Sequence, residues 1–138
     1  EGRLRGCIGS YFPQRPMVED VAHNAARAAI ADPRFKPLTE NEVAGLDVTI
    51  AILSTPRRIP ATDEAGVLAA LQPDVDGLIL QGGGKQAIFL PKVWSSLPDP
   101  KDFIRALKMK AGLAADDWPA DMRAFRYRTE TFDAPGAE

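Results

Sequence analysis

The sequence has 138 residues, the size of one ordinary globular domain. Its 45% hydrophobic and 26% charged residues exclude the composition of an intrinsically disordered chain. Seventeen Lys and Arg against 19 Asp and Glu leave a net charge of −2, so no global field attracts nucleic acid or an anionic membrane. Binding of nucleic acid would need a local basic patch.

No apolar stretch approaches the roughly 20 residues that cross a bilayer, and the N-terminus lacks the plan of a secretory signal. These features predict a soluble, cytoplasmic protein with no membrane partner. The single cysteine, Cys7, excludes an intramolecular disulfide, and with one histidine it excludes a Cys/His zinc cage. The loop aspartates show no ligand periodicity, so we expect neither a metal site nor a cofactor.

The first element in chain order is a strand over residues 2–9, which ends in a glycine-flanked turn. Because the chain opens inside this strand, we expect further N-terminal elements to belong to the fold. Pro16 begins a helix that runs to about Ala31, where Asp32-Pro33 ends it. Its predicted buried face consists of small residues at helical spacing: Val18, Val21, Ala22, Ala25 and Ala29.

Thr39 and Glu42 form a capping-box pattern for one helical turn, and residues 46–54 alternate as a central strand. A helix follows over residues 63–71. Two apolar runs around Gly82–Lys85 then predict a β-hairpin over residues 77–90. The remaining elements are a helix with Asp99 and Gly112 as its caps and a last strand over residues 123–131.

This order predicts an α+β fold with a mixed, mainly antiparallel sheet and about three helices. We expect a single domain over residues 1–132 and a tail over residues 133–138.

The segment around Cys7 is the strongest candidate for chemistry. Glycines on both sides of the thiol let another molecule approach the backbone, and nearby arginines favour the thiolate. Alternation within a strand would place Arg3 and Arg5 on the side of Cys7. The alternative interpretation is that Cys7 is a small buried hydrophobic residue and that the glycines only make a tight turn.

Two further groups bear on this candidate. His23, the one possible imidazole partner of Cys7, lies on the side of the predicted helix away from the alanine stripe, which favours a solvated surface residue over a Cys/His pair. Arg34 can present a forked donor to a phosphate or carboxylate, although Asp32–Phe35 also suits a plain helix-ending turn. Gly82–Lys85 does not fit a phosphate-binding loop, because a strand follows the lysine instead of a helix.

The chain resembles the AMMECR family. The resemblance is carried in order along nearly the whole chain by Leu4-Arg5-Gly6-Cys7-Ile8-Gly9, Ala25-Ala26, Asp32-Pro33-Arg34-Phe35, Asp76–Leu80, Phe89–Trp94 and Lys110–Leu113. In the detail of these motifs the chain is similar to the bacterial and archaeal form of the family, the protein A of the AmmeMemoRadiSam system.

The resemblance implies a larger and a smaller subdomain and partners of the Memo type and the radical-SAM type. It also implies a cleft with Cys7 and Arg5 as candidate catalytic residues. The binding residues implied there are Leu4, Gly6, Ile8, Gly9, Asp32, Pro33, Arg34 and Phe35.

Two functions follow as hypotheses. In the first, the chain is a small enzyme or catalytic subunit that uses Cys7 as nucleophile or redox thiol, with Arg5 and backbone N–H groups stabilising an anion. In the second, the same cleft is a non-catalytic module that recognises a protein partner, an anionic ligand or RNA, since no convincing second catalytic group accompanies Cys7.

Overall fold

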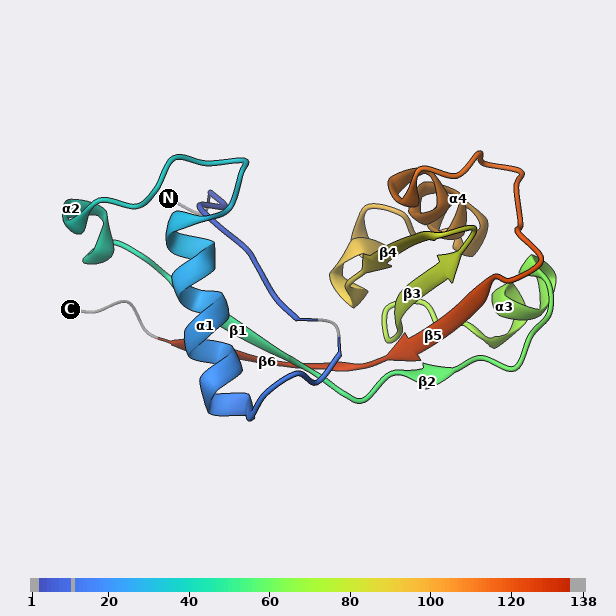
Figure 1. The fold of residues 1–138 in the computed structure, drawn as a ribbon, viewed down its shortest axis with the longest axis horizontal. Coiled ribbons are helices and arrows are strands. Elements are labelled where there is room, and N and C mark those ends of the chain that lie inside the picture. Colours follow the sequence, from blue (N-terminus) through green and yellow to red (C-terminus); the bar gives the residue numbers. More distant parts are fainter. Residues whose placement is uncertain (1–2, 11, 135–138) are drawn as a thin grey trace. The chain divides into compact units, whose positions relative to one another are not determined.

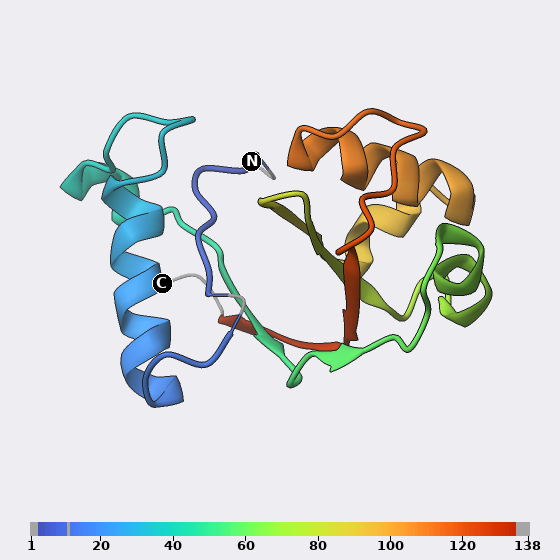
Figure 2. The same ribbon diagram turned by 45° about the vertical axis from the view of Figure 1, so that its right-hand side comes forward.

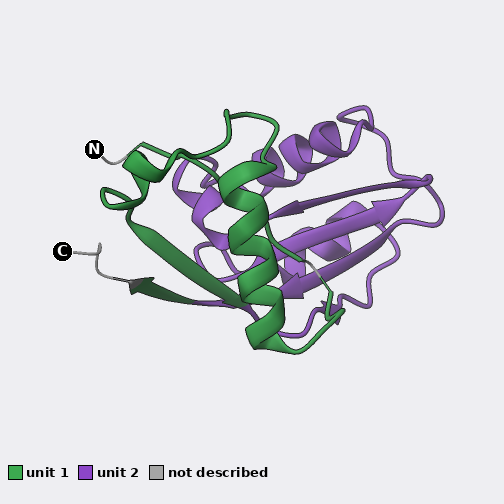
Figure 3. Ribbon diagram, turned by 60° about the vertical axis from the view of Figure 1, so that its left-hand side comes forward, with its two compact units in different colours: residues 1–52, 131–138 green, residues 53–130 purple. Residues whose placement is uncertain are grey.

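The computed structural model describes residues 3–10 and 12–134 (Figure 1). The chain divides into two compact units: unit 1 comprises residues 1–52 and 131–138, and unit 2 comprises residues 53–130 (Figure 3). The architecture is α+β, as predicted. No helix among the described residues is long and apolar enough to span a membrane.

Unit 1 is built on helix α1 (Met17–Ile30), and the short helix α2 (Glu40–Val43) follows it. Strands β1 (Val48–Leu53) and β6 (Thr129–Ala134) pair in a two-stranded sheet. The predicted capping box at Thr39 and Glu42 is present at the start of α2.

Unit 2 contains a four-stranded sheet in the order β2-β5-β3-β4, with every pairing antiparallel. Its elements in chain order are β2 (Arg57–Arg58), α3 (Glu64–Ala70), β3 (Gly77–Gly82), β4 (Lys85–Phe89), the 3-10 helix η1 (Pro91–Ser95), α4 (Pro100–Ala111) and β5 (Arg123–Tyr127). Figure 2 shows this sheet with α3 and α4 beside it.

Local signals in unit 2 confirm the predicted hairpin and helix ends. Gly83 and Gly84, with φ of 59° and 72°, turn β3 back into β4, and these left-handed values favour glycine. The Asp99 side chain accepts the backbone N–H of Lys101 at the start of α4, and Gly112 ends the helix at φ 89°.

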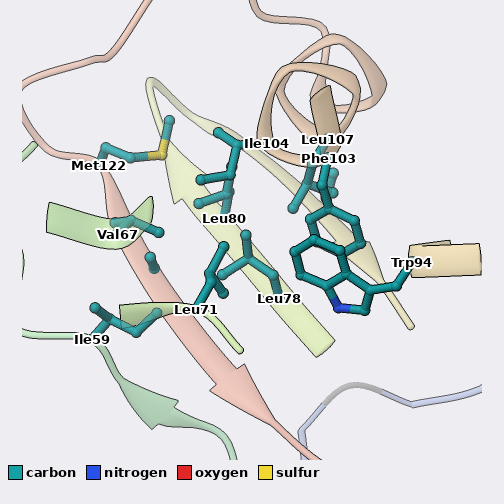
Figure 4. Packing of buried hydrophobic residues seen from close by; sticks show 12 residues of the cluster. Ile59, Val67, Leu71, Leu78, Leu80, Trp94, Phe103, Ile104, Leu107 and Met122 are labelled. Atoms are coloured by element: carbon teal, nitrogen blue, oxygen red, sulfur yellow. The ribbon is translucent and has the colours of Figure 1, made fainter. Parts of the chain in front are cut away.

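The buried hydrophobic core lies in unit 2, where one face of β3 packs with α3, α4 and η1 (Figure 4). The indole of Trp94 stacks on the ring of Phe103 with centroids 3.7 Å apart, and it donates its N–H to the carbonyl of Asp76 at 2.7 Å. Lys108 is also fully buried, and its Nζ lies 2.9 Å from Oε2 of Glu64.

Several sequence expectations were wrong in detail. Residues 3–10 form no strand, and β1 belongs to a two-stranded sheet and so is not central. The last strand is divided at Arg128 into β5 and β6. The expected tail begins too early, because Asp133 lies in β6 and accepts a hydrogen bond from Thr49 at 2.6 Å; residues 135–138 lie outside the described part.

The predicted buried face of α1 was also wrong. Val18, Ala22 and Ala25 are exposed, whereas Asn24 is buried. The reason is a polar contact, because the Asn24 amide donates to Ser10 Oγ at 3.0 Å and to Asp20 Oδ2 at 3.1 Å. These hydrogen bonds place the side of α1 that carries Asn24 against the N-terminal segment.

Candidate functional site

The segment from Leu4 to Gly9 passes close to α1 in unit 1, and Gly6 makes this approach possible. A Cβ on Gly6 would collide with the backbone carbonyl oxygen of Ala28, whereas a Cβ on Gly9 would meet no atom within 4 Å. Only a residue without a side chain therefore lets the backbone beside Cys7 lie against the helix.

Asp32 is the buried centre of the site. Its Oδ2 accepts the backbone N–H of Cys7 at 3.0 Å and Nη2 of Arg34 at 2.7 Å. Its Oδ1 accepts both Nε and the backbone N–H of Arg34 at 3.0 Å. The Arg34 side chain and then the Cys7 N–H hold the pKa of Asp32 far below its usual range.

Arg34 is a cation that contacts the backbone of Cys7. Its side chain remains 54% exposed although two of its nitrogens bind Asp32, and its Nη2 lies 3.5 Å from the Cys7 carbonyl oxygen. The hydrogen bond to Asp32 raises the pKa of Arg34 above its ordinary value, and the charge of Asp32 contributes in the same direction. The guanidinium nitrogen Nη1 makes no hydrogen bond with a described residue, so it can bind a ligand.

Arg5 has a different role. Its Nε and Nη2 bind the two carboxylate oxygens of Glu42 at 3.0 and 3.3 Å, and its Nη1 donates to the carbonyl of Lys36 at 2.7 Å. The Arg5 side chain lowers the pKa of Glu42 to about 2, and the Thr39 N–H acts in the same direction. Arg5 thus connects the Cys7 segment to α2 and to the loop before it.

The Cys7 thiol itself is exposed. The adjacent backbone N–H groups of Ile8 and Gly9 make no hydrogen bond with any described residue. His23 is exposed on α1 and forms no described contact with Cys7. Among the described residues, Cys7 is therefore followed in the chain by two hydrogen-bond donors without a partner, and it has no imidazole partner.

The structure brings together five of the residues that the sequence singled out: Arg5, Gly6, Cys7, Asp32 and Arg34. The Phe35 ring accompanies them, with the guanidinium carbons of Arg5 and Arg34 at 5.9 and 5.4 Å from its centroid. The remaining candidates, Leu4, Ile8, Gly9 and Pro33, border this cluster in sequence and form no side-chain hydrogen bond with a described residue.

Sequence reasoning missed the parts that Glu42 and Ala28 play. The capping box identified Glu42 as a helix-start residue, but its pairing with Arg5 joins positions 37 residues apart. The Ala25-Ala26 block lies near Ala28 in the sequence. The close approach of Gly6 involves the backbone carbonyl of Ala28, which every residue type has, so the sequence cannot indicate it.

Two other features lie outside this cluster. The described residues include no group of three or more His, Cys, Asp or Glu side chains placed to hold a metal ion. A cavity of about 330 Å³ in unit 2 is lined at the hairpin tip by residues that include Gln81, Lys85 and Arg123.

We expect Gly6→Ala to destabilise unit 1 by about 1–3 kcal/mol, because the new methyl group meets a helix carbonyl that cannot rotate away. Hydrogen exchange of the peptides covering residues 3–10 and α1 measures this loss. Gly9→Ala is the matched control and should leave exchange unchanged. Equal hydrogen exchange in the two variants would show that the missing side chain of Gly6 is not needed for the Cys7 segment to lie against α1.

The lowered pKa values of Asp32 and Glu42 predict a stability that depends on pH. A carboxylate with a lowered folded-state pKa contributes above its unfolded value, and the contribution is lost as pH falls through the folded value. For Glu42 this interval runs from its ordinary value of 4.5 down to about 2. We expect the protection of residues 3–10 from hydrogen exchange to fall as pH decreases over this interval. The fall should be shallower in Glu42→Gln than in the wild type when the two are compared at each pH. Equal pH dependence in the two proteins would show that the Glu42 carboxylate does not hold this segment.

The chain was compared with known proteins. The AMMECR1 family model matches residues 1–132. A protein of Methanothermobacter thermautotrophicus is 32% identical over 138 residues, covering 99% of this chain and 72% of its own length. The protein MJ0810 of Methanocaldococcus jannaschii is 33% identical, covering 94% of this chain and 66% of its own length.

A solved structure gives the same result for the fold. The crystal structure of the protein PH0010 from Pyrococcus horikoshii superposes with a TM-score of 0.86 at 31% identity. The match covers 96% of this chain and 66% of that chain. The present chain therefore spans 66–72% of the length of these three relatives.

Proposed function

Since the chain belongs to the AMMECR1 family, we propose that its Arg-Gly-Cys segment is a thiol-dependent site of a small enzyme or catalytic subunit, with Cys7 as the nucleophile. The observation that carries this proposal is the exposed Cys7, which is followed in the chain by two N–H groups without a hydrogen bond to a described residue, while the guanidinium of Arg34 lies 3.5 Å from the Cys7 carbonyl oxygen. A nucleophile flanked by hydrogen-bond donors suits attack on a carbonyl carbon.

The proposed step is acyl transfer to sulfur. The Cys7 thiolate forms an S–C bond with its own electron pair while the carbonyl π pair moves to oxygen, and the donors stabilise that oxyanion. Collapse of the oxyanion restores the carbonyl and expels the leaving group with its bonding electrons. Water then hydrolyses the acyl-Cys7 to a carboxylic acid and the free thiol.

The other residues of the site have positioning roles in this proposal. Asp32 orients both Cys7 and Arg34, because one carboxylate binds the backbone of the first and the side chain of the second. Both arginines are paired with a carboxylate, and the contact that favours Arg34 over Arg5 is the 3.5 Å distance from Arg34 Nη2 to the Cys7 carbonyl oxygen.

The test uses p-nitrophenyl acetate as a generic activated ester. We expect a burst of nitrophenolate and an acetyl group on Cys7 by mass spectrometry, both absent in Cys7→Ser. Losing one oxyanion donor in other enzymes costs roughly 10²–10³ in rate, so Arg34→Gln should acetylate at least about tenfold more slowly than the wild type.

Arg3→Gln is the control for this experiment. Arg3 is exposed and forms no hydrogen bond or ion pair with a described residue, so its loss changes the net charge by the same amount without removing a described contact of the site. Acetylation no faster than that of glutathione, or equal slowing in Arg34→Gln and Arg3→Gln, would overturn the enzymatic proposal.

A second function, a non-catalytic recognition module, is favoured by one observation. The charged side chains around Cys7 are held in the internal pairs Arg34–Asp32 and Arg5–Glu42, so neither carboxylate of these described pairs is free to act as a general base. The proposed partners are the Memo-type and radical-SAM proteins of the AmmeMemoRadiSam system. Co-purification tests this function: binding that survives Cys7→Ala supports it, and no association at any salt concentration contradicts it.

A further inference from the structure

Five arginines gather on two paired strands of unit 2. Strand β2 pairs with strand β5, and this pairing brings together positions that are far apart in the sequence (Figure 1). Arg128 directly follows β5. All five side chains are exposed: Arg57, Arg58, Arg123, Arg126 and Arg128. By alternation along the strands, Arg58 and Arg123 leave one face of the sheet and Arg57 and Arg126 leave the other, in a chain whose net charge is −2.

Three of these arginines share one side of the sheet and form what we call the arginine triad: Arg57, Arg126 and Arg128. Arg57 lies directly opposite Arg126 in the antiparallel register, so their side chains leave the same face. Arg126 Nη1 donates to the carbonyl of Ala70 at 3.1 Å, and Arg128 Nη2 donates to Gln72 Oε1 at 3.3 Å. The last two arginines therefore both reach the end of α3.

No carboxylate of a described residue forms an ion pair with the triad. The salt bridges found among the described residues involve other cations. Asp76, which follows Gln72 closely, is buried, and its Oδ2 accepts the backbone N–H of Gln72. Like charges directly opposite on neighbouring strands are destabilising, and here only neutral oxygens offset them.

We propose that the arginine triad binds the sugar–phosphate backbone of a single-stranded nucleic acid. The planar guanidinium of arginine matches the spacing of phosphate oxygens. The acceptors that Arg126 and Arg128 now use are neutral, and a hydrogen bond to a charged phosphate oxygen is stronger than one to a neutral acceptor. Replacing or supplementing the neutral acceptors with a phosphate therefore makes binding more favourable. The patch is an exposed row along two strands. Separate exposed charges gain most from a polymer whose phosphates repeat, because each contact releases a condensed counterion.

This proposal is independent of the Cys7 site and is tested by the salt dependence of binding. The probe is a fluorescein-labelled uridine oligonucleotide of about 16 nucleotides, the upper end of common single-strand site sizes. Anisotropy gives the association constant at several salt concentrations. Each phosphate contact contributes about −0.7 to the slope of log K against log salt.

For the wild type we expect binding at low salt with a slope of about −2, or steeper if other cations contribute. The Arg57→Gln/Arg126→Gln/Arg128→Gln variant should lose about 2 from that slope and bind at least about tenfold more weakly. Arg57→Gln alone should lose about 0.7. This single variant keeps the test decisive if the triple variant folds poorly, since Arg57 has no side-chain contact to lose.

The matched control removes three other exposed cations of unit 2, as Lys92→Gln/Lys101→Gln/Arg105→Gln, with the same change in net charge. It should keep the wild-type slope within about 0.7, the value of one contact. Equal losses in the two triple variants, absence of oligonucleotide binding at low salt, or preferential binding of an acidic peptide or of anionic vesicles would overturn the proposal.

Discussion

Trp94→Ala is expected to lower the free energy of unfolding of unit 2 by about 3–5 kcal/mol, the usual cost of removing a large buried aromatic side chain. The indole is 1% exposed and stacks on Phe103 with an interplanar angle of 4°. Its loss also leaves the buried carbonyl of Asp76 without the indole N–H. Urea denaturation followed by far-UV circular dichroism measures the change.

Trp118→Ala provides the control with the same residue type. Trp118 is only partly buried at the margin of the same core, so its loss should cost clearly less. Equal destabilisation by the two substitutions would contradict the assignment of Trp94 to the centre of the core.

The second large effect concerns Lys108, whose side chain is fully buried with its Nζ against Glu64. Breaking a buried pair by removing one partner typically costs about 3–5 kcal/mol, because the remaining charge is left without compensation. Since Glu64 remains 33% exposed, we expect Glu64→Ala to fall at the lower end of this range, about 3 kcal/mol. The same denaturation experiment measures it.

The double variant Glu64→Ala/Lys108→Met isolates the charge from the packing. Methionine fills the space of the lysine stem without a charge, and buried pairs replaced by apolar residues often lose little stability. The double variant should therefore be more stable than Glu64→Ala alone. A double variant that is less stable than Glu64→Ala would show that the unpaired charge of Lys108 is not the cause of the destabilisation in Glu64→Ala.

Features that depend on neighbours in the chain were predictable from the sequence. The caps of α4, the capping box of α2 and the hairpin between β3 and β4 each require particular residues within a few positions. The Asp32–Arg34 pair lies two residues apart, so the Asp-Pro-Arg block already contained it. The free thiol was evident as the one cysteine.

Features that depend on distant neighbours were not predictable. Helical spacing identified an apolar stripe on α1, but the side chains from Ser10 and Asp20 bind Asn24 on another side. The partner of Arg5 is 37 residues away, and the partner of the buried Lys108 is 44 residues away. Short-range periodicity cannot indicate which long-range partner a charged side chain finds.

The division of the last strand has the same origin. Alternation continues through Arg128, so the sequence predicted one strand over residues 123–131. In the structure, the backbone N–H of Arg128 donates to the Ser54 hydroxyl at 2.8 Å, and the Arg128 carbonyl accepts the Ser54 N–H at 2.8 Å. A side chain thus takes one ladder position, and this contact lies where β5 gives way to β6.

The central claim is that Cys7 is a reactive thiol, and the rate of alkylation by iodoacetamide measured from pH 5 to pH 9 tests it most directly. In the folded protein we predict faster labelling at neutral pH than glutathione shows, with Arg34→Gln approaching glutathione and Arg3→Gln unchanged. Labelling of folded wild-type protein that is no faster than that of glutathione across this pH range would contradict the claim.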